Sequence, residues 1–109
     1  MNYTVRKGEK KDMSSVWLLI KELAAFENEP DAVEVSVKDL ENDGFSINPK
    51  FEILVGELDN EIVGIALFYY RYSTWKGPTI HLEDLVVKED KRGLGIGKAL
   101  YNEVMRYAY

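Results

Sequence analysis

A run of glycines between an apolar stretch and a helical pattern constrains this chain more than any other feature. Residues 91–98 read KRGLGIGK. The stretch before them is filled by β-branched and large apolar side chains, as a buried strand requires: Ile80, Leu82, Leu85, Val86 and Val87. The residues after them repeat apolar side chains at helical spacing: Ile96, Ala99, Leu100, Val104 and Tyr107. We therefore expect the glycines to lie in a strand-to-helix turn.

This turn has the properties of a phosphate site. The first N–H groups of a helix lack intrahelical partners, and the positive end of the helix dipole lies at the same place. Glycines remove the side chains that would keep an anion away, and Arg92 and Lys98 add positive charge. The alternative is a glycine-rich turn that serves only the geometry of the connection.

Two common phosphate motifs do not fit these residues. A Walker P-loop needs a glycine where Arg92 stands and a hydroxyl where Ala99 stands. The dinucleotide fingerprint needs its third glycine at Lys98, and its acidic ribose ligand would fall beyond the last residue. The pattern that does fit is R-x-x-G-x-G, with Arg92, Gly95 and Gly97 after an apolar strand.

Composition favours one small globular domain. The chain has 109 residues, of which 46% are hydrophobic and 30% charged, enough for one core and too apolar for disorder. With no cysteine and one histidine, we expect neither disulfides nor a metal site. No signal peptide or transmembrane run is visible, so we expect a cytoplasmic protein that does not bind membranes. The net charge of -5 argues against nucleic acid and suits a cationic small substrate.

The first half of the chain predicts a strand and two helices. A short strand from Tyr3 to Val5 is ended by Gly8. Asp12 is expected to cap a helix with one apolar face, formed by Met13, Val16, Trp17, Ile20, Leu23 and Ala24. Residues 36–39 resemble a capping box in which Asp39 replaces the usual Glu, and the short helix that it opens stops at Gly44.

The apolar stripe of the first helix, if continued, reaches Glu27. A carboxylate on the buried side of a helix is costly unless it is paired or faces a cleft. Alternatively the helix frays before Asn28, Glu29 and Pro30, and Glu27 lies in water. The sequence leaves both interpretations open.

Two strands follow, joined by a tight turn at Asp59 and Asn60. Residues 51–56 alternate in polarity, whereas residues 62–72 are apolar on both faces, as expected of a central strand covered by helices. Aromatic residues crowd the end of the second strand: Tyr69, Tyr70, Tyr72 and Trp75. They either pack in the core and its rim or form a wall for an apolar ligand chain.

The strand before the glycines, Thr79 to Lys88, contains two adjacent acids, Glu83 and Asp84. Strand alternation sends them to opposite faces, so they do not form a simple dyad. Both cannot easily be unpaired in a central strand, and at least one should be paired or catalytic.

The predicted order is β-α-α-β-β-β-α, with no repeat, low-complexity tract or linker. This order indicates an α/β (α+β layered) fold: a mixed sheet with helices on both faces, in a single domain over residues 1–109.

The glycine loop resembles the acetyl-coenzyme A pyrophosphate loop of the GCN5-related N-acetyltransferases (GNAT). Six segments together resemble the diamine (spermidine/spermine) acetyltransferase branch, which also includes enzymes acting on thialysine. These segments are Leu19–Leu23, Asp43–Phe45, Phe68–Tyr70, Trp75, Leu82–Asp84 and Arg92–Gly97.

The resemblance implies transfer of acetyl from acetyl-coenzyme A, as co-substrate, to a primary amine of a small molecule such as a polyamine or thialysine. It assigns Glu83 as the catalytic base and Phe26, Glu27 and Glu83 as contacts of the amine. The backbone of Leu85, Val86 and Val87 would bind the acetyl-pantetheine arm. The pyrophosphate would bind at Arg92, Gly93, Leu94, Gly95, Ile96, Gly97 and Lys98.

Enzymes of this family continue beyond the equivalent of Tyr109, and the further part supplies the tyrosine that protonates the leaving thiolate and half of the cofactor cleft. A strand followed by a helix also normally returns to a parallel neighbour. We therefore expect this chain to be the amino-terminal part of an incomplete domain that associates with itself, as the family's homodimers imply. The rival expectation is a module that binds coenzyme A without catalysis.

Overall fold

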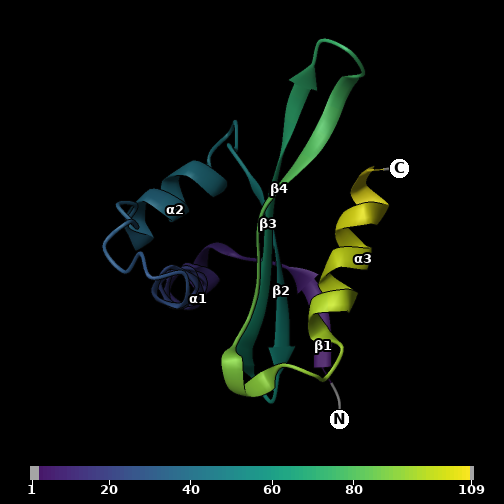
Figure 1. Cartoon of the computed structure of the whole chain (residues 1–109). Coiled ribbons are helices and arrows are strands. Elements are labelled where there is room, and N and C mark those ends of the chain that lie inside the picture. Colours follow the sequence, from purple (N-terminus) through teal and green to yellow (C-terminus); the bar gives the residue numbers. More distant parts are fainter. Residues whose placement is uncertain (1–2, 109) are drawn as a thin grey trace.

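The structure is a computed structural model that describes residues 3–108, and its elements follow the predicted order (Figure 1). None of the helices in this part of the chain is long and apolar enough to cross a membrane. Two short 3₁₀ helices, η1 and η2, precede α1 and α3. The elements are β1 Tyr3–Lys7, η1 Lys10–Asp12, α1 Met13–Phe26, α2 Val37–Gly44, β2 Glu52–Leu58, β3 Glu61–Ser73, β4 Gly77–Val87, η2 Glu89–Lys91 and α3 Ile96–Ala108.

The four strands form one sheet in the order β1-β2-β3-β4, and each neighbouring pair is antiparallel. The layered α/β class is confirmed. The mixed character expected for the sheet does not occur within residues 3–108, because no strand there pairs in parallel. β4 is consequently an edge strand of the sheet, next to β3 alone.

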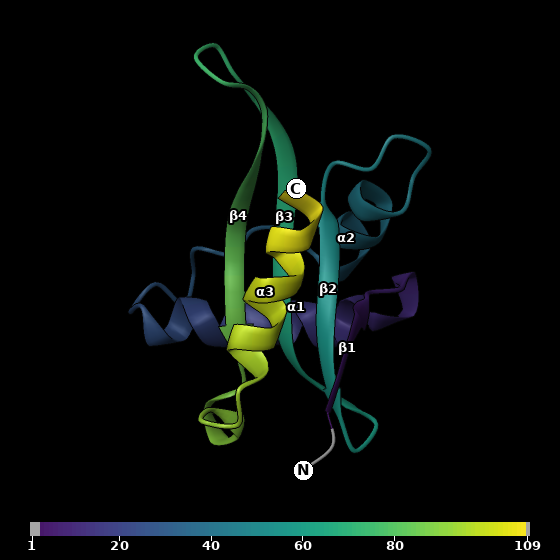
Figure 2. The same cartoon turned by 90° about the vertical axis from the view of Figure 1, so that its right-hand side faces the viewer.

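Helices cover both faces of the sheet. α1 and α2 lie on one face and α3 lies on the other (Figures 1 and 2). Side chains that alternate along β2 and β3 therefore enter two separate cores. Val16 and Ile65 belong to the core under α1 and α2, whereas Phe68 and Leu100 belong to the core under α3. This explains why β3 is apolar on both faces, as predicted.

Two paired glycines let α3 lie close to the sheet. Gly56 of β2 and Gly64 of β3 are register partners. A Cβ atom on Gly56 would lie 2.8 Å from Cγ2 of Ile96, and one on Gly64 would lie 3.1 Å from Cδ1 of Leu100. Contacts this short do not occur without a shift, so the missing side chains set the position of the first turns of α3.

The structure corrects the role predicted for Asp12. Asp12 immediately precedes α1, but its carboxylate does not cap that helix. It accepts instead from the backbone N–H of Glu9 at 2.8 Å and from Nη1 of Arg6 at 2.9 Å. Asp12 is 7% exposed, and β1 brings a guanidinium next to it, so an ion pair takes precedence over a cap.

The capping box predicted for the second helix is confirmed. The N–H of Asp39 donates to Oγ of Ser36 at 3.0 Å, and the N–H of Ser36 donates to Oδ2 of Asp39 at 2.9 Å. The turn between β2 and β3 is confirmed as well. Asp59 and Asn60 both have positive φ, at 52° and 64°, as a two-residue hairpin turn of this hand requires.

The β3–β4 hairpin extends beyond the rest of the sheet (Figures 1 and 2). β2 stops pairing with β3 at Phe68, so among the described residues no third strand accompanies the hairpin beyond that point. Three of its aromatic side chains lie in solvent: Tyr70 is 58% exposed, Tyr72 73% and Trp75 94%. The interpretation of this group as core and rim packing is therefore wrong for Tyr72 and Trp75, whereas Tyr70 makes an edge contact with the buried ring of Phe68.

Candidate functional site

The predicted strand-to-helix turn is present between β4 and α3, with η2 as its first part. Gly93 and Gly95 have φ values of 87° and 88°, a backbone conformation that glycine adopts without a steric penalty. The carbonyl of Gly95 accepts the first helical bond, from the N–H of Ala99 at 3.0 Å. The N–H groups just before Ala99 therefore lack helical acceptors and are open to an anion.

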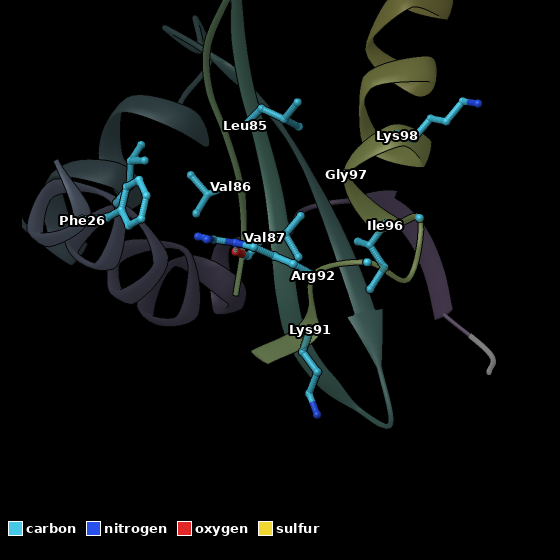
Figure 3. A pocket seen from close by; sticks show the side chains of 12 residues that line it. Phe26, Leu85, Val86, Val87, Lys91, Arg92, Ile96, Gly97 and Lys98 are labelled. Carbon is cyan, nitrogen blue, oxygen red and sulfur yellow. Dashed lines mark hydrogen bonds between the residues drawn. The ribbon is translucent and has the colours of Figure 1, made fainter. Parts of the chain in front are cut away.

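A cavity of about 470 Å³ lies between this turn, the end of α1 and the adjacent part of β4 (Figure 3). Its walls combine apolar side chains of α1 and β4 with cations and glycines of the turn. The lining residues are Leu23, Phe26, Leu85, Val86, Val87, Lys91, Arg92, Gly93, Gly95, Ile96, Gly97 and Lys98.

The structure thus brings together the residues predicted to bind the cofactor, with one exception. Leu94 does not line the cavity and packs against the apolar core under α3. Three lining residues were not predicted as cofactor contacts: Leu23, Lys91 and Phe26, the last of which was predicted to contact the amine. Lys91 stands next to Arg92 in the basic glycine run, so its charge was the signal that could have identified it.

The shape and chemistry of the cavity fit a diphosphate. Gly97 and Val87 both line the cavity, and a Cβ atom on Gly97 would contact Cγ2 of Val87 at 3.4 Å. The glycine therefore keeps the part of the cavity between these two residues open. Lys91, Arg92 and Lys98 add three positive charges to the N–H groups of the helix start. Helix N-termini with glycines and cations are a common way to hold phosphate.

Arg92 crosses the cavity toward α1 (Figure 3). Its Nε donates to the carbonyl oxygen of Val87 at 3.0 Å. Its guanidinium lies over the ring of Phe26, with Cζ 5.5 Å from the ring centroid. Phe26, predicted to contact the amine, therefore lies against the cationic turn and remains 68% exposed.

Glu27 lies just beyond the end of α1 and is exposed, so the interpretation that places it in water is confirmed. Asn28 adopts positive φ, at 62°, and closes the helix. The N–H of Glu29 donates to the carbonyl oxygen of Ala24, and the N–H of Asn28 donates to that of Ala25. These are the two hydrogen bonds of a Schellman motif. The helix ends there because an asparagine tolerates the left-handed conformation.

A β-bulge occurs in β4 at its two adjacent acids, Glu83 and Asp84. Leu67 pairs with Asp84 and Phe68 with Leu82, which leaves Glu83 without a partner on β3. The bulge interrupts the alternation from which opposite faces were predicted. Glu83 is exposed, with Oε1 3.4 Å from Nε2 of His81 and 3.5 Å from the hydroxyl of Tyr69.

Asp84, the second acid of the pair, is half-buried. Burial raises the pKa of Asp84, and the negative charges of Glu83 and Glu27 raise it further. Asp84 is thus influenced by an acid from each of two distant segments, its neighbour Glu83 on β4 and Glu27 at the end of α1. Asp84 was recognised in the sequence as unusual, but no role was assigned to it.

Known proteins resemble this chain in sequence. A sequence model of the acetyltransferase (GNAT) family matches residues 16–109. The human spermidine/spermine N(1)-acetyltransferase-like protein 1 is 37% identical over 113 residues, which cover 97% of this chain and 16% of that protein. The thialysine N-epsilon-acetyltransferase of Bos taurus is 38% identical over 112 residues, which cover 95% of this chain and 66% of that protein. The chain thus spans only part of both relatives.

Solved structures share the fold. The ribosomal-protein-alanine N-acetyltransferase of Brucella melitensis superposes with a TM-score of 0.76 at 21% identity, covering 99% of this chain and 72% of that one. The glucosamine-6-phosphate N-acetyltransferase of Arabidopsis thaliana superposes with a TM-score of 0.75 at 20% identity, covering 98% and 74%. Because the family model matches residues 16–109, more than half of the chain, the chain belongs to the acetyltransferase (GNAT) family.

Proposed function

We propose that this chain binds acetyl-coenzyme A and belongs to an enzyme that acetylates a primary amine of a small molecule, such as a polyamine or thialysine. The observation that carries the proposal is the cavity between β4, the glycine turn and the end of α1, which Lys91, Arg92 and Lys98 line. The names of the two relatives, a spermidine/spermine acetyltransferase-like protein and a thialysine acetyltransferase, supply the class of amine.

The residues of the turn would hold the pyrophosphate. The N–H groups at Ile96, Gly97 and Lys98 would donate to its oxygens, and Lys91, Arg92 and Lys98 would balance its charge. The free edge of β4 at Leu85 to Val87 would hold the acetyl-pantetheine arm through backbone groups. Acetyl-coenzyme A supplies the acetyl group as a thioester. N–H groups of this edge would polarise its carbonyl and keep it in line with the amine.

The acids at the bulge would prepare the amine. An alkylammonium ion has a pKa of about 10 and must lose a proton before it can attack. We propose Glu83 as the base, since its bulge position leaves the carboxylate exposed on the cofactor strand, two residues before Leu85. Glu27 and Asp84 add negative charge, which favours a cationic substrate. Because the raised pKa of Asp84 also makes it a stronger proton acceptor, Asp84 is the competitor for this role.

The test is acetylation of a panel of polyamines and thialysine by the protein at its full natural length. Glu83→Gln should lower kcat by about 10²- to 10⁴-fold, the usual contribution of a general base. Asp84→Asn should mainly raise KM for the amine, and Glu29→Gln, which removes an exposed acid, is the control.

The outcomes separate the alternatives. Full activity of Glu83→Gln together with a large kcat loss in Asp84→Asn would transfer the role of base to Asp84. Binding of coenzyme A without turnover of any amine would favour a module that only binds the cofactor, and no binding at all would rule out both functions.

We further infer that residues 1–109 form one incomplete domain and that the protein associates as a homodimer. The support is the edge position of β4, whose outer backbone groups have no strand partner within residues 3–108. A cytoplasmic location stays a prediction.

A further inference from the structure

One face of α1 touches the phosphate turn at two places. Glu22 and Phe26 are four residues apart, so their side chains lie one above the other on the helix. Oε1 of Glu22 accepts from the backbone N–H of Glu89 at 3.0 Å. The ring of Phe26 lies against the guanidinium of Arg92, 5.5 Å from Cζ. Glu89 is the first residue of η2 and Arg92 directly follows it, so α1 contacts both ends of η2.

The turn needs such support because little of it is packed. Glu89, Asp90 and Arg92 are exposed, and the two positive-φ glycines follow directly. Phe26 is itself 68% exposed, so burial in a core does not explain an aromatic residue at this position. Its contact with Arg92 does explain it, since an aromatic face attracts a guanidinium.

The geometry leaves Arg92 ready for an anion. Within residues 3–108, this side chain donates a hydrogen bond only through Nε, to the carbonyl of Val87. The guanidinium lies over the ring of Phe26, and within residues 3–108 its two terminal nitrogens make no hydrogen bond. An arginine presents these nitrogens as a fork that matches two oxygens of a phosphate. Fixing the side chain before binding avoids the loss of rotamer freedom on binding.

We propose that Glu22 and Phe26 are positioning residues for the phosphate turn, and that Phe26 acts on cofactor affinity through Arg92 rather than by contacting the amine. This inference rests on the proposed function, because it takes the pyrophosphate of coenzyme A as the anion. α1 also connects the proposed cofactor site with the proposed amine site. Glu27 directly follows α1, and its negative charge contributes to the raised pKa of Asp84.

The first test measures coenzyme A binding by calorimetry. Phe26→Ala should weaken binding by about two- to five-fold, the effect of an exposed cation–π contact. Phe26→Tyr keeps an aromatic face and should bind as the unchanged protein does. Leu18→Ala is the matched control, because Leu18 lies on the same helix, is 62% exposed and does not line the cavity.

A double-mutant cycle distinguishes positioning from a general structural effect. If Phe26 acts through Arg92, Phe26→Ala should have no further effect in an Arg92→Ala background. Additive losses would overturn the inference. So would a rise in KM for spermidine with unchanged affinity for coenzyme A, because Phe26 would then touch the amine.

Hydrogen exchange tests, without any ligand, whether Glu22 and Phe26 hold the phosphate turn in place. Glu22→Ala should accelerate exchange of the Glu89 amide, and Glu22→Gln, which keeps an acceptor, should restore its protection. Unchanged exchange at residues 88–95 in both Glu22→Ala and Phe26→Ala would overturn the inference even if coenzyme A binds. If the unchanged chain fails to bind coenzyme A, the proposed function fails, and with it the link to Phe26, whatever the exchange shows.

Discussion

Asp84 lies half-buried next to two other acids, and this environment sets its contribution to stability. Burial first, and then the charges of Glu83 and Glu27, raise the pKa of Asp84 above its value in the unfolded chain. A carboxyl group with a raised pKa stabilises the folded state below the unfolded pKa, and this contribution is lost as the pH rises through the folded pKa. Ionised Asp84 therefore destabilises the protein near neutral pH.

We accordingly predict that Asp84→Asn raises the melting temperature at about pH 7 and no longer raises it at about pH 3, where the aspartate is protonated in both states. Thermal unfolding at the two pH values measures the difference. Glu29→Gln, at an exposed position beyond α1, should change little at either pH. An equal gain from Asp84→Asn at both pH values would show that ionisation is not the cause.

Gly97 separates stability from binding. Its backbone is helical, and an added Cβ would make an ordinary contact with Val87 at 3.4 Å. Gly97→Ala should therefore fold normally but weaken coenzyme A binding on the order of tenfold, because the methyl group narrows the cavity. Gly77→Ala is the contrast. Its positive φ of 82° should cost about 1–2 kcal/mol of stability with no change in affinity, as denaturation and calorimetry would show. Wild-type affinity in Gly97→Ala would contradict the placement of the pyrophosphate.

At the scale of elements, the close packing of α3 on Gly56 and Gly64 decides where the phosphate turn lies. Gly64→Ala would place Cβ 3.1 Å from Cδ1 of Leu100 and 3.2 Å from Cγ2 of Ile96, so these side chains, and with them the helix, are pushed outward by a few tenths of an ångström. We predict a loss of about 1–3 kcal/mol and weaker coenzyme A binding, since the turn moves with the helix. Ser36→Ala, on the opposite face, should lose about 1 kcal/mol with its cap and leave binding unchanged. Equal effects of both variants on affinity would show that general destabilisation, and not the position of α3 on the sheet, weakens coenzyme A binding.

At the scale of the whole molecule, the edge of the sheet at β4 is the surface most suited to contact another chain. It spans Gly77–Val87 at the edge of the sheet, and Leu85 on it is 39% exposed. Apolar edge strands pair with other chains. We predict that the chain self-associates at micromolar concentration, with a mass of at least two chains in light scattering, and that Leu85→Lys reduces this association. A monomer with a single cooperative melting transition would contradict the prediction.

The local sequence determined the elements and the turns. The order of strands and helices, the capping box at Ser36, the hairpin turn at Asp59 and the glycine turn before α3 were all predictable, because each depends on residues within a few positions of one another. Of the candidate site, the sequence identified the turn and the cofactor strand for the same reason, and misplaced only Leu94 among the residues expected along the cavity.

Tertiary structure decided which side chains meet across the fold. Asp12 pairs with Arg6 instead of capping α1, the pairing of β3 with β4 creates the bulge at Glu83, and the guanidinium of Arg92 lies over the ring of Phe26. Gly56 and Gly64 matter because α3 packs on them. Each of these contacts joins segments whose separation along the chain hides their proximity, and the energy of a buried charge or a packed helix depends on the partner that the fold supplies.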